Sequence, residues 1–340
     1  MESSTSTSHG SPLTEKELAW REGRLKRIHE WQQKNPYAPF IDEAAIEKTL
    51  EENRRPSREA VRDIIARARA NATTGEMLSP AEVAMLSHVE DPELWEEIFE
   101  TAYGIKQTVY GNRIVLFAPL YVSSPCVNNC LYCGFRSSNT SVAKRTLNQE
   151  ELDEEIRALV NVGHKRLIMV YGEAPENDWR YMCETIAEAY RVKEGPGEIR
   201  RANVNAAPLF VDEYSDVRSV GIGTYQVFQE TYHRPTYRRV HPEGTLKGEF
   251  DWRAFSLHRA QEAEIDDVAI GVLFGLYNWR YELLGLLHHA MSLEKAFGVG
   301  PHTISYPRLE PAEGTAVASH SPWLVSDADC KKLVAMIRLM

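Results

Sequence analysis

The sequence predicts an α/β fold of the (βα)8 TIM-barrel type, preceded by a helical extension. From residue 112 onward, apolar β-rich runs alternate with helical segments, and this order implies right-handed βαβ units and a parallel sheet. No G-x-G-x-x-G follows the first of these strands, which weighs against an open doubly wound sheet. Only about six βα units can be recognised, so we expect an incomplete barrel that resembles a fragment or a truncated product.

The region before the barrel divides into two parts. Residues 1–14 are rich in Ser and Thr and predict a disordered tail. Residues 15–111 carry an almost purely helical signal and form a predicted N-terminal helical region. Ser79 and Asp91 mark two helix starts within it, because each is followed by Pro at the first helical position. The barrel domain is then expected over residues 112–340.

Six strands and the helices between them follow in order. Runs of apolar and β-branched residues predict buried strands, and Asn148 caps a helix that ends at Gly163. Further helices are expected around 178–193, before Ala263, over 279–297 and from Ser326 onward, with a surface loop at 310–323. The predicted strands are 114–121, 166–171, 199–205, 224–229, 267–272 and 303–306.

Composition excludes several classes of protein. The formal net charge of −10 argues against a general binder of nucleic acid or anionic membrane surfaces. No stretch of about 18 uninterrupted apolar residues exists, so no membrane span is expected. The N-terminus lacks the basic and apolar regions of a signal peptide. We therefore expect a cytoplasmic protein without nucleic-acid or membrane partners.

Three cysteines, Cys126, Cys130 and Cys133, follow the first strand with C-x3-C-x2-C spacing. A disulfide would leave one thiol over, and a structural zinc ion usually takes four protein ligands. The remaining cysteines, Cys183 and Cys330, are isolated on predicted helices. A 4Fe-4S cluster held by three thiolates fits better, because it leaves one iron open for a ligand. A non-catalytic zinc-binding scaffold stays open as an alternative.

Polar side chains recur where the predicted strands end, which is where barrel enzymes place their chemistry. Each has a structural explanation of its own: Glu173 could cap a helix, Asn205 could hold a turn, and Arg308 could pair with Glu310. Their joint placement favours a site at one mouth of the barrel. Besides the cysteines, the candidates are Glu173, Asn203, Asn205, Gln229, Glu230, Ser305 and Arg308.

The stretch 118–135 resembles the radical S-adenosylmethionine (SAM) superfamily. Other segments resemble the tyrosine lyases of FeFe-hydrogenase maturation, the HydG type, and the resemblance covers roughly residues 20–340. The ThiH-type 2-iminoacetate synthases of thiamine thiazole synthesis match the cysteine stretch nearly as well, and some later segments less well. The segments that resemble the HydG type are 197–205, 228–237, 265–268 and 298–308.

This resemblance implies the cofactors and the reaction. Cys126, Cys130 and Cys133 would bind a 4Fe-4S cluster whose open iron chelates SAM. The enzyme would cleave the Cα–Cβ bond of L-tyrosine to p-cresol and dehydroglycine, using an electron donor such as ferredoxin or flavodoxin. Other hydrogenase maturation proteins would be its partners. The family continues into two more barrel strands and a C-terminal domain with a second cysteine triad. We therefore expect this chain at most to cleave tyrosine, without forming carbon monoxide and cyanide.

The resemblance also implies residue roles. Gly172 and Glu173 match the motif that accepts the SAM amino group, and Arg308 would clamp the tyrosine carboxylate. Ser305 and Tyr121 would lie beside the substrate amino group. The other implied cofactor-binding residues are Asn203, Asn205, Gln229 and Glu230, which include the contacts to the SAM carboxylate and ribose, and Phe135, which would pack by the adenine.

Overall fold

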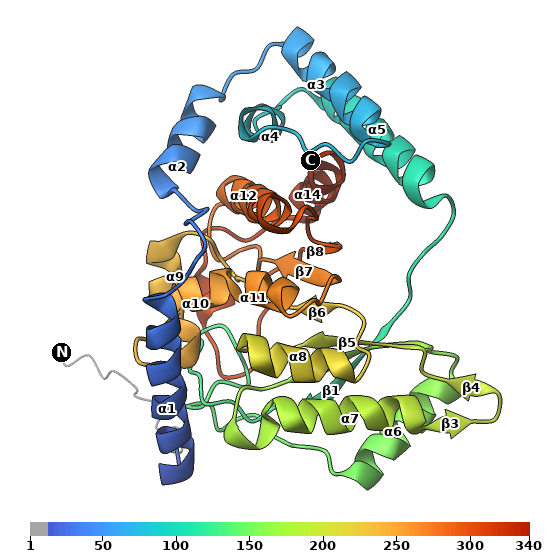
Figure 1. Ribbon diagram of the computed structural model, residues 1–340. Coiled ribbons are helices and arrows are strands. Elements are labelled where there is room, and N and C mark those ends of the chain that lie inside the picture. Colours follow the sequence, from blue (N-terminus) through green and yellow to red (C-terminus); the bar gives the residue numbers. More distant parts are fainter. Residues whose placement is uncertain (1–12) are drawn as a thin grey trace.

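The computed structural model describes residues 13–340, and its core is a six-stranded parallel sheet (Figure 1). The strand order β1-β2-β5-β6-β7-β8 follows the sequence, as in a barrel wall built one unit at a time. The predicted α/β class and the number of strands are confirmed. The strands are β1 (Ala118–Ser123), β2 (Arg166–Tyr171), β5 (Arg201–Asn205), β6 (Tyr225–Gln226), β7 (Val268–Gly271) and β8 (Thr303–Ser305).

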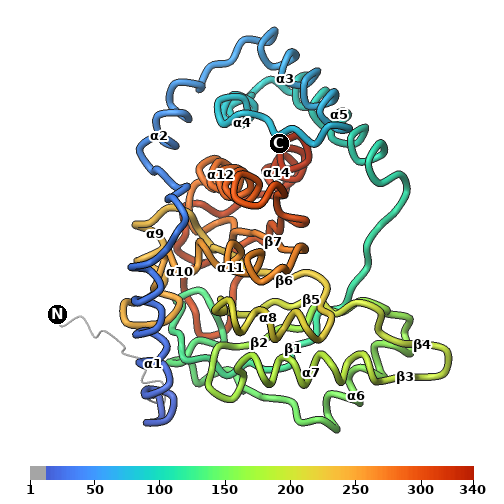
Figure 2. The backbone as a smooth tube through the Cα atoms, in the orientation of Figure 1, coloured from blue at the N-terminus to red at the C-terminus, as the bar shows by residue number. Residues whose placement is uncertain are grey.

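Helices connect the strands and cover the outside of the sheet (Figure 2). Asn148 caps α6 with a complete capping box, and the predicted range 279–297 is that of α12. An antiparallel pair, β3 (Lys193–Glu194) and β4 (Gly197–Glu198), was not predicted. The helices of this region are α6 (Gln149–Asn161), α7 (Trp179–Arg191), α8 (Val211–Ser219), α9 (Arg234–Val240), α10 (Phe250–Ala254), α11 (Ser256–Glu262), α12 (Trp279–Phe297), α13 (Val317–His320) and α14 (Asp327–Leu339).

The N-terminal helices reach two different parts of the molecule. α3, α4 and α5 pack against α14, whereas α1 lies along α10 and two short 3-10 helices, η1 (Pro175–Asn177) and η2 (Leu246–Gly248). The predicted caps Ser79 and Asp91 both accept a hydrogen bond from the first turn of their helices. The helices are α1 (Glu15–Gln32), α2 (Glu43–Glu52), α3 (Arg58–Asn71), α4 (Pro80–Ser87) and α5 (Pro92–Tyr110).

The first predicted strand, 114–121, is wrong at its start. Pairing begins at Ala118, which lies opposite Leu167 near the beginning of β2. The backbone before Ala118 therefore has no partner strand, and Ile114 is 78% exposed. The fourth strand is shorter than predicted, although the Gln229 amide still donates to the Gly271 carbonyl at 2.9 Å.

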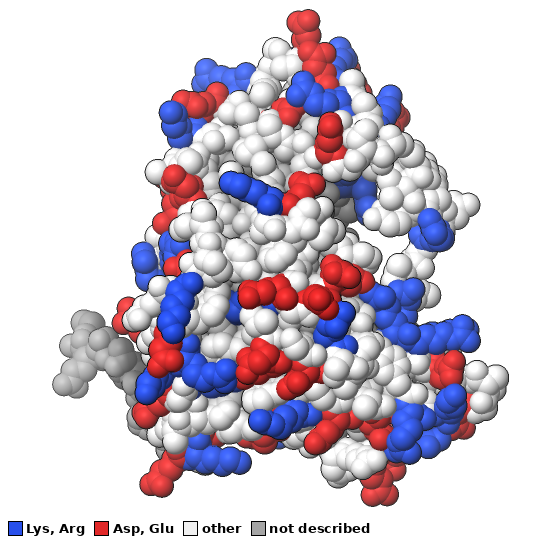
Figure 3. Space-filling view, in the orientation of Figure 1, with Lys and Arg blue, Asp and Glu red and all other residues white. Residues whose placement is uncertain are grey.

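The predicted disordered tail, 1–14, lies outside the described residues except for Leu13 and Thr14. Thr14 forms the capping box of α1 together with Glu17. Within residues 13–340, no helix is both long and apolar enough to cross a membrane. On the face shown in Figure 3, acidic and basic side chains are interspersed and do not form one large basic patch.

Candidate functional site

A pocket of about 420 Å³ opens at the carboxyl ends of β1, β2 and β5 and beyond the end of β6. In a parallel barrel all these strand ends meet at one face, so residues far apart in sequence converge there. Nine of the thirteen predicted site residues line the pocket: Tyr121, Cys126, Cys130, Cys133, Phe135, Gly172, Glu173, Asn205 and Glu230.

The loop that carries the cysteines is fixed against the end of β2. The Val127 amide donates to the Glu173 carbonyl at 2.7 Å. Gly172 allows this close approach, because a Cβ atom at this position would lie 2.1 Å from the Pro125 carbonyl oxygen. Glycine is therefore required here for steric reasons, independently of any ligand.

The three thiols fit a cluster better than a single ion. No group of three His, Cys, Asp or Glu side chains within residues 13–340 is placed to bind one metal ion. In a 4Fe-4S cube each thiolate binds a different iron, and the sulfurs are accordingly more widely spaced. Burial raises the pKa of the Cys130 thiol to about 12, while the nearby Lys247 lowers it.

Asn128, inside the cysteine motif, joins three parts of the site. Its side chain is buried, and its Nδ2 donates to Glu173 Oε2 at 2.5 Å and lies 3.6 Å from Cys126 Sγ. Its Oδ1 accepts from the Lys247 amide at 2.9 Å. Sequence reasoning missed this residue, because the spacing argument considered only the thiols.

Two carboxylates, buried Glu230 and half-buried Glu173, and two cations give the pocket its electrostatic character. Lys247 Nζ lies 2.7 Å from Glu230 Oε1, and an Arg253 amino group lies 3.6 Å from the same oxygen. Burial raises the pKa of Glu173, while Arg24, Asn128, Arg253 and Lys247 favour its ionised form. Such a set can bind the ammonium and carboxylate groups of an amino acid. The sequence did not point to Lys247 or Arg253, since neither directly follows a strand in the sequence. Both lie on short helices, η2 and α10.

α1 contributes Arg24 next to the pocket. Arg24 makes a bidentate ion pair with buried Glu213, at 2.8 and 2.9 Å, at the start of α8. Arg24 also faces the small cavity lined by Gly172 and Glu173. The N-terminal helical region thus contributes a charge near the pocket, which no local pattern in the sequence indicates.

Three of the predicted residues lie outside the pocket wall, held by contacts of their own. Asn203 Oδ1 accepts from the Thr224 amide at 2.9 Å, because its side chain points along the sheet between β5 and β6. Gln229 is buried, with its side-chain amide 3.5 Å from the Phe250 carbonyl, and Ser305 pairs with Gly271 at the end of β8. Their predicted roles stay predictions.

Arg308 is also outside the pocket. Its guanidinium lies 2.5 Å from Asp327 at the start of α14 and 4.0 Å from Glu310. The contact with Glu310 is the structural role that the sequence suggested for Arg308. A clamp on a substrate carboxylate would require the side chain to leave Asp327.

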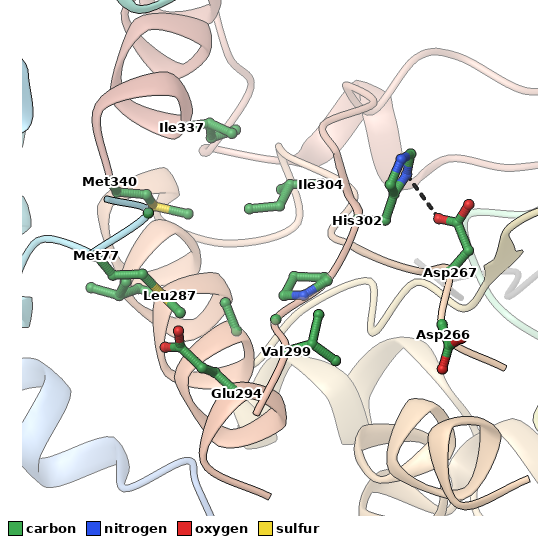
Figure 4. Close-up of a pocket in the computed structure, with 14 residues that line it drawn as sticks. Met77, Asp266, Asp267, Leu287, Glu294, Val299, His302, Ile304, Ile337 and Met340 are labelled. Atoms are coloured by element: carbon green, nitrogen blue, oxygen red, sulfur yellow. Dashed lines mark ion pairs between the residues drawn. The ribbon is translucent and has the colours of Figure 1, made fainter. Parts of the chain in front are cut away.

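A second cavity, of about 540 Å³, lies between α12, α14 and β8 (Figure 4). His302 and Asp267, 2.9 Å apart, stand at its polar edge just before β8 and β7 begin. It therefore lies at the amino ends of the strands, away from the face where barrels place their chemistry. None of the predicted site residues lines it.

Comparison with known proteins agrees with this geometry. Residues 120–284 match the Radical SAM superfamily. A 2-iminoacetate synthase of Escherichia coli (strain K12) is 30% identical over 220 residues, which are 64% of this chain and 56% of that protein. The chain thus spans a little over half the length of this curated relative.

Two solved structures of HydG, a maturase of FeFe-hydrogenase, are also similar. One is 46% identical with a TM-score of 0.85, covering 89% of this chain and 65% of that chain. The other, from Carboxydothermus hydrogenoformans, is 38% identical with a TM-score of 0.75, covering 95% and 69%.

The chain belongs to the radical SAM superfamily, whose members use a 4Fe-4S cluster and SAM. Within that superfamily it is similar to HydG over most of its own length, as the sequence predicted. The predicted superfamily and its two cofactors are confirmed.

Proposed function

We propose that this chain is a radical SAM lyase of the HydG type, which cleaves the Cα–Cβ bond of L-tyrosine to p-cresol and dehydroglycine. The observation that carries the proposal is the convergence of Cys126, Cys130, Cys133 and Glu173 on one pocket at the barrel mouth. The 46% identity to a HydG structure supports the choice of substrate. A cytoplasmic location and a ferredoxin or flavodoxin as electron donor belong to the same proposal.

The residues of the chain have definite tasks in this reaction. The cluster and SAM, when bound, would supply the electron and the radical that abstracts hydrogen. Glu173 would accept a hydrogen bond from an ammonium group, while Asn128 fixes its carboxylate. Lys247 and Arg253 would balance a carboxylate. Tyr121 and Phe135, with ring centroids 6.0 Å apart, would form an aromatic wall that helps to exclude water.

Anaerobic incubation with SAM, dithionite and tyrosine tests the proposal. The reconstituted protein should release p-cresol and 5′-deoxyadenosine together. Formation of 5′-deoxyadenosine without p-cresol would contradict tyrosine as the substrate.

A ThiH-type 2-iminoacetate synthase is the second candidate, supported by the 30% identity to the E. coli protein. Both candidates cleave tyrosine, so p-cresol release does not separate them. The higher identity to HydG favours hydrogenase maturation. Supplying the products to a thiazole-forming system, and separately to a hydrogenase-maturing one, distinguishes the pathways.

Arg308 is the predicted clamp for tyrosine, and a matched pair of variants tests this role. Arg308→Ala should weaken tyrosine binding roughly tenfold or more, as expected for loss of a charge-assisted hydrogen bond. Asp327→Ala removes the partner of Arg308 but leaves its charge, and should not weaken tyrosine binding. Equilibrium binding of tyrosine to the SAM-loaded protein measures both. Unchanged tyrosine affinity in Arg308→Ala would contradict the clamp and leave Arg308 with only its ion pair to Asp327.

A further inference from the structure

Glu282 is a buried carboxylate for which the proposed mechanism has no use. It lies in the first turn of α12, it is fully buried, and within residues 13–340 it has no cationic partner. Burial raises its pKa to about 8. It accepts hydrogen bonds from the Thr231 hydroxyl and, at 2.8 Å, from the Tyr232 amide. Burying a carboxyl group costs free energy unless hydrogen bonds replace its lost hydration. The two hydrogen bonds of Glu282 are therefore essential to its burial.

Those contacts hold the turn that follows Glu230. Glu230 has a φ of +70°, a conformation that non-glycine residues adopt rarely and at a cost of about 1–3 kcal/mol. Such backbone persists only where the surroundings fix it. The Glu230 carbonyl accepts from the Leu273 amide at 2.9 Å, and its carboxylate lies in the pocket, 2.7 Å from Lys247.

α12 contacts the same turn at two further residues, Gly285 and His289. A Cβ atom at Gly285, one helical turn after Glu282, would lie 2.4 Å from the Tyr232 ring, so the helix and the ring are in close contact. The Tyr232 hydroxyl lies 2.7 Å from His289 Nδ1, one further turn along α12. Three successive turns of one helix thus contact Thr231 and Tyr232.

We propose that Glu282 is a positioning residue: it anchors the Thr231–Tyr232 turn, holds Glu230 in its left-handed conformation and keeps the Glu230 carboxylate beside Lys247 in the SAM pocket. The inference rests on the proposed function for the ligand, but the anchoring itself concerns only this chain. It predicts that hydrogen-bond acceptance at residue 282 matters and that negative charge does not.

Two variants separate these properties. Glu282→Gln keeps an acceptor and the shape, so SAM affinity of the reconstituted protein should stay within about twofold of the wild type. Glu282→Leu removes both acceptors at similar volume, and should weaken SAM binding roughly tenfold or more as Glu230 relaxes. Anaerobic equilibrium binding of SAM gives the dissociation constants. Equal affinity in the wild type and the folded Leu variant, or equal weakening in both variants, would overturn the proposal.

Glu82 supplies a control, with an ion pair to Arg67 at 2.6 Å that Glu282 lacks. It is also buried and accepts hydrogen bonds at the start of a helix, α4, but does not line the SAM pocket. Glu82→Leu should lower the thermal unfolding midpoint while leaving SAM affinity unchanged. If Glu82→Leu weakens SAM binding as much as Glu282→Leu, general destabilisation explains both and the positioning role is lost.

Hydrogen–deuterium exchange tests the anchor without any cofactor. In Glu282→Leu the amides of Tyr232 and Leu273 should exchange faster, because the first loses its acceptor and the second bonds to the Glu230 carbonyl. Protection equal to that of the wild type would overturn the anchor. If the wild-type protein fails to bind SAM, the proposed function fails, and the exchange result still decides whether Glu282 holds the turn.

Discussion

Replacing Gly172 by Ala should prevent the protein from assembling its cluster. The added Cβ would lie 2.1 Å from the Pro125 carbonyl oxygen and 2.9 Å from the Pro125 carbonyl carbon, which are backbone atoms and cannot rotate away. The Asn177 side chain donates to the same oxygen at 3.0 Å and holds it in place. Relief therefore requires the cysteine loop to move as a whole, at a cost at or above the usual ~1–3 kcal/mol of overpacking.

The measurement is iron and sulfide content per chain after anaerobic reconstitution, with the visible spectrum of the cluster. We expect Gly172→Ala to lose most of both. Gly104 in α5 is the control, because no atom lies within 4 Å of a Cβ added there, and Ala is the better helix former. Full cluster content in a folded Gly172→Ala protein would show that the loop can shift freely.

The sequence predicts the site residues that lie in the cysteine motif or directly after a strand. The cysteine spacing and the polar residues at strand ends required only that consecutive strands be parallel, and Glu173, Asn205 and Glu230 do reach the pocket. The fold class followed from the same alternation. Where a residue directly follows a buried strand, its place at the barrel mouth is fixed by topology.

The remaining contributors could not be predicted because tertiary packing selects them. Arg24 is on the first helix and reaches the site only because α1 packs along η1, η2 and α10. Lys247 and Arg253 follow no strand. Asn203 looks equivalent to Asn205 in sequence, yet its side chain bonds to the neighbouring strand's Thr224 amide.

The ends of the strands also depend on tertiary packing, and the sequence predicts them less well. Ile114 to Phe117 have the apolar character of a buried strand, but a strand exists only where a neighbour offers hydrogen bonds. β2 begins at Arg166 and supplies partners only from Ala118 onward. No property of residues 114–117 themselves contains that information.

Arg24→Met should be the most destabilising single change in the N-terminal region. It leaves the Glu213 carboxylate, fully buried and bonded through two oxygens, without its main cation. Breaking a buried ion pair by removing one partner typically costs about 3–5 kcal/mol. Arg27, 3.4 Å from the same carboxylate, remains, so we expect about 3 kcal/mol in the free energy of unfolding in urea.

Three further proteins, Arg27→Met, Glu213→Gln and a double variant, show whether the unpaired charge causes that loss. Arg27→Met removes a half-exposed arginine from the same cluster, and should cost less than ~1 kcal/mol. The double variant Arg24→Met/Glu213→Gln leaves no unpaired carboxylate, so its loss of stability should be clearly smaller than the summed losses of Arg24→Met and Glu213→Gln. Additive losses would mean that Arg24 acts through its packing on Trp20 and Phe210, and that α1 is held to the barrel by apolar contact instead.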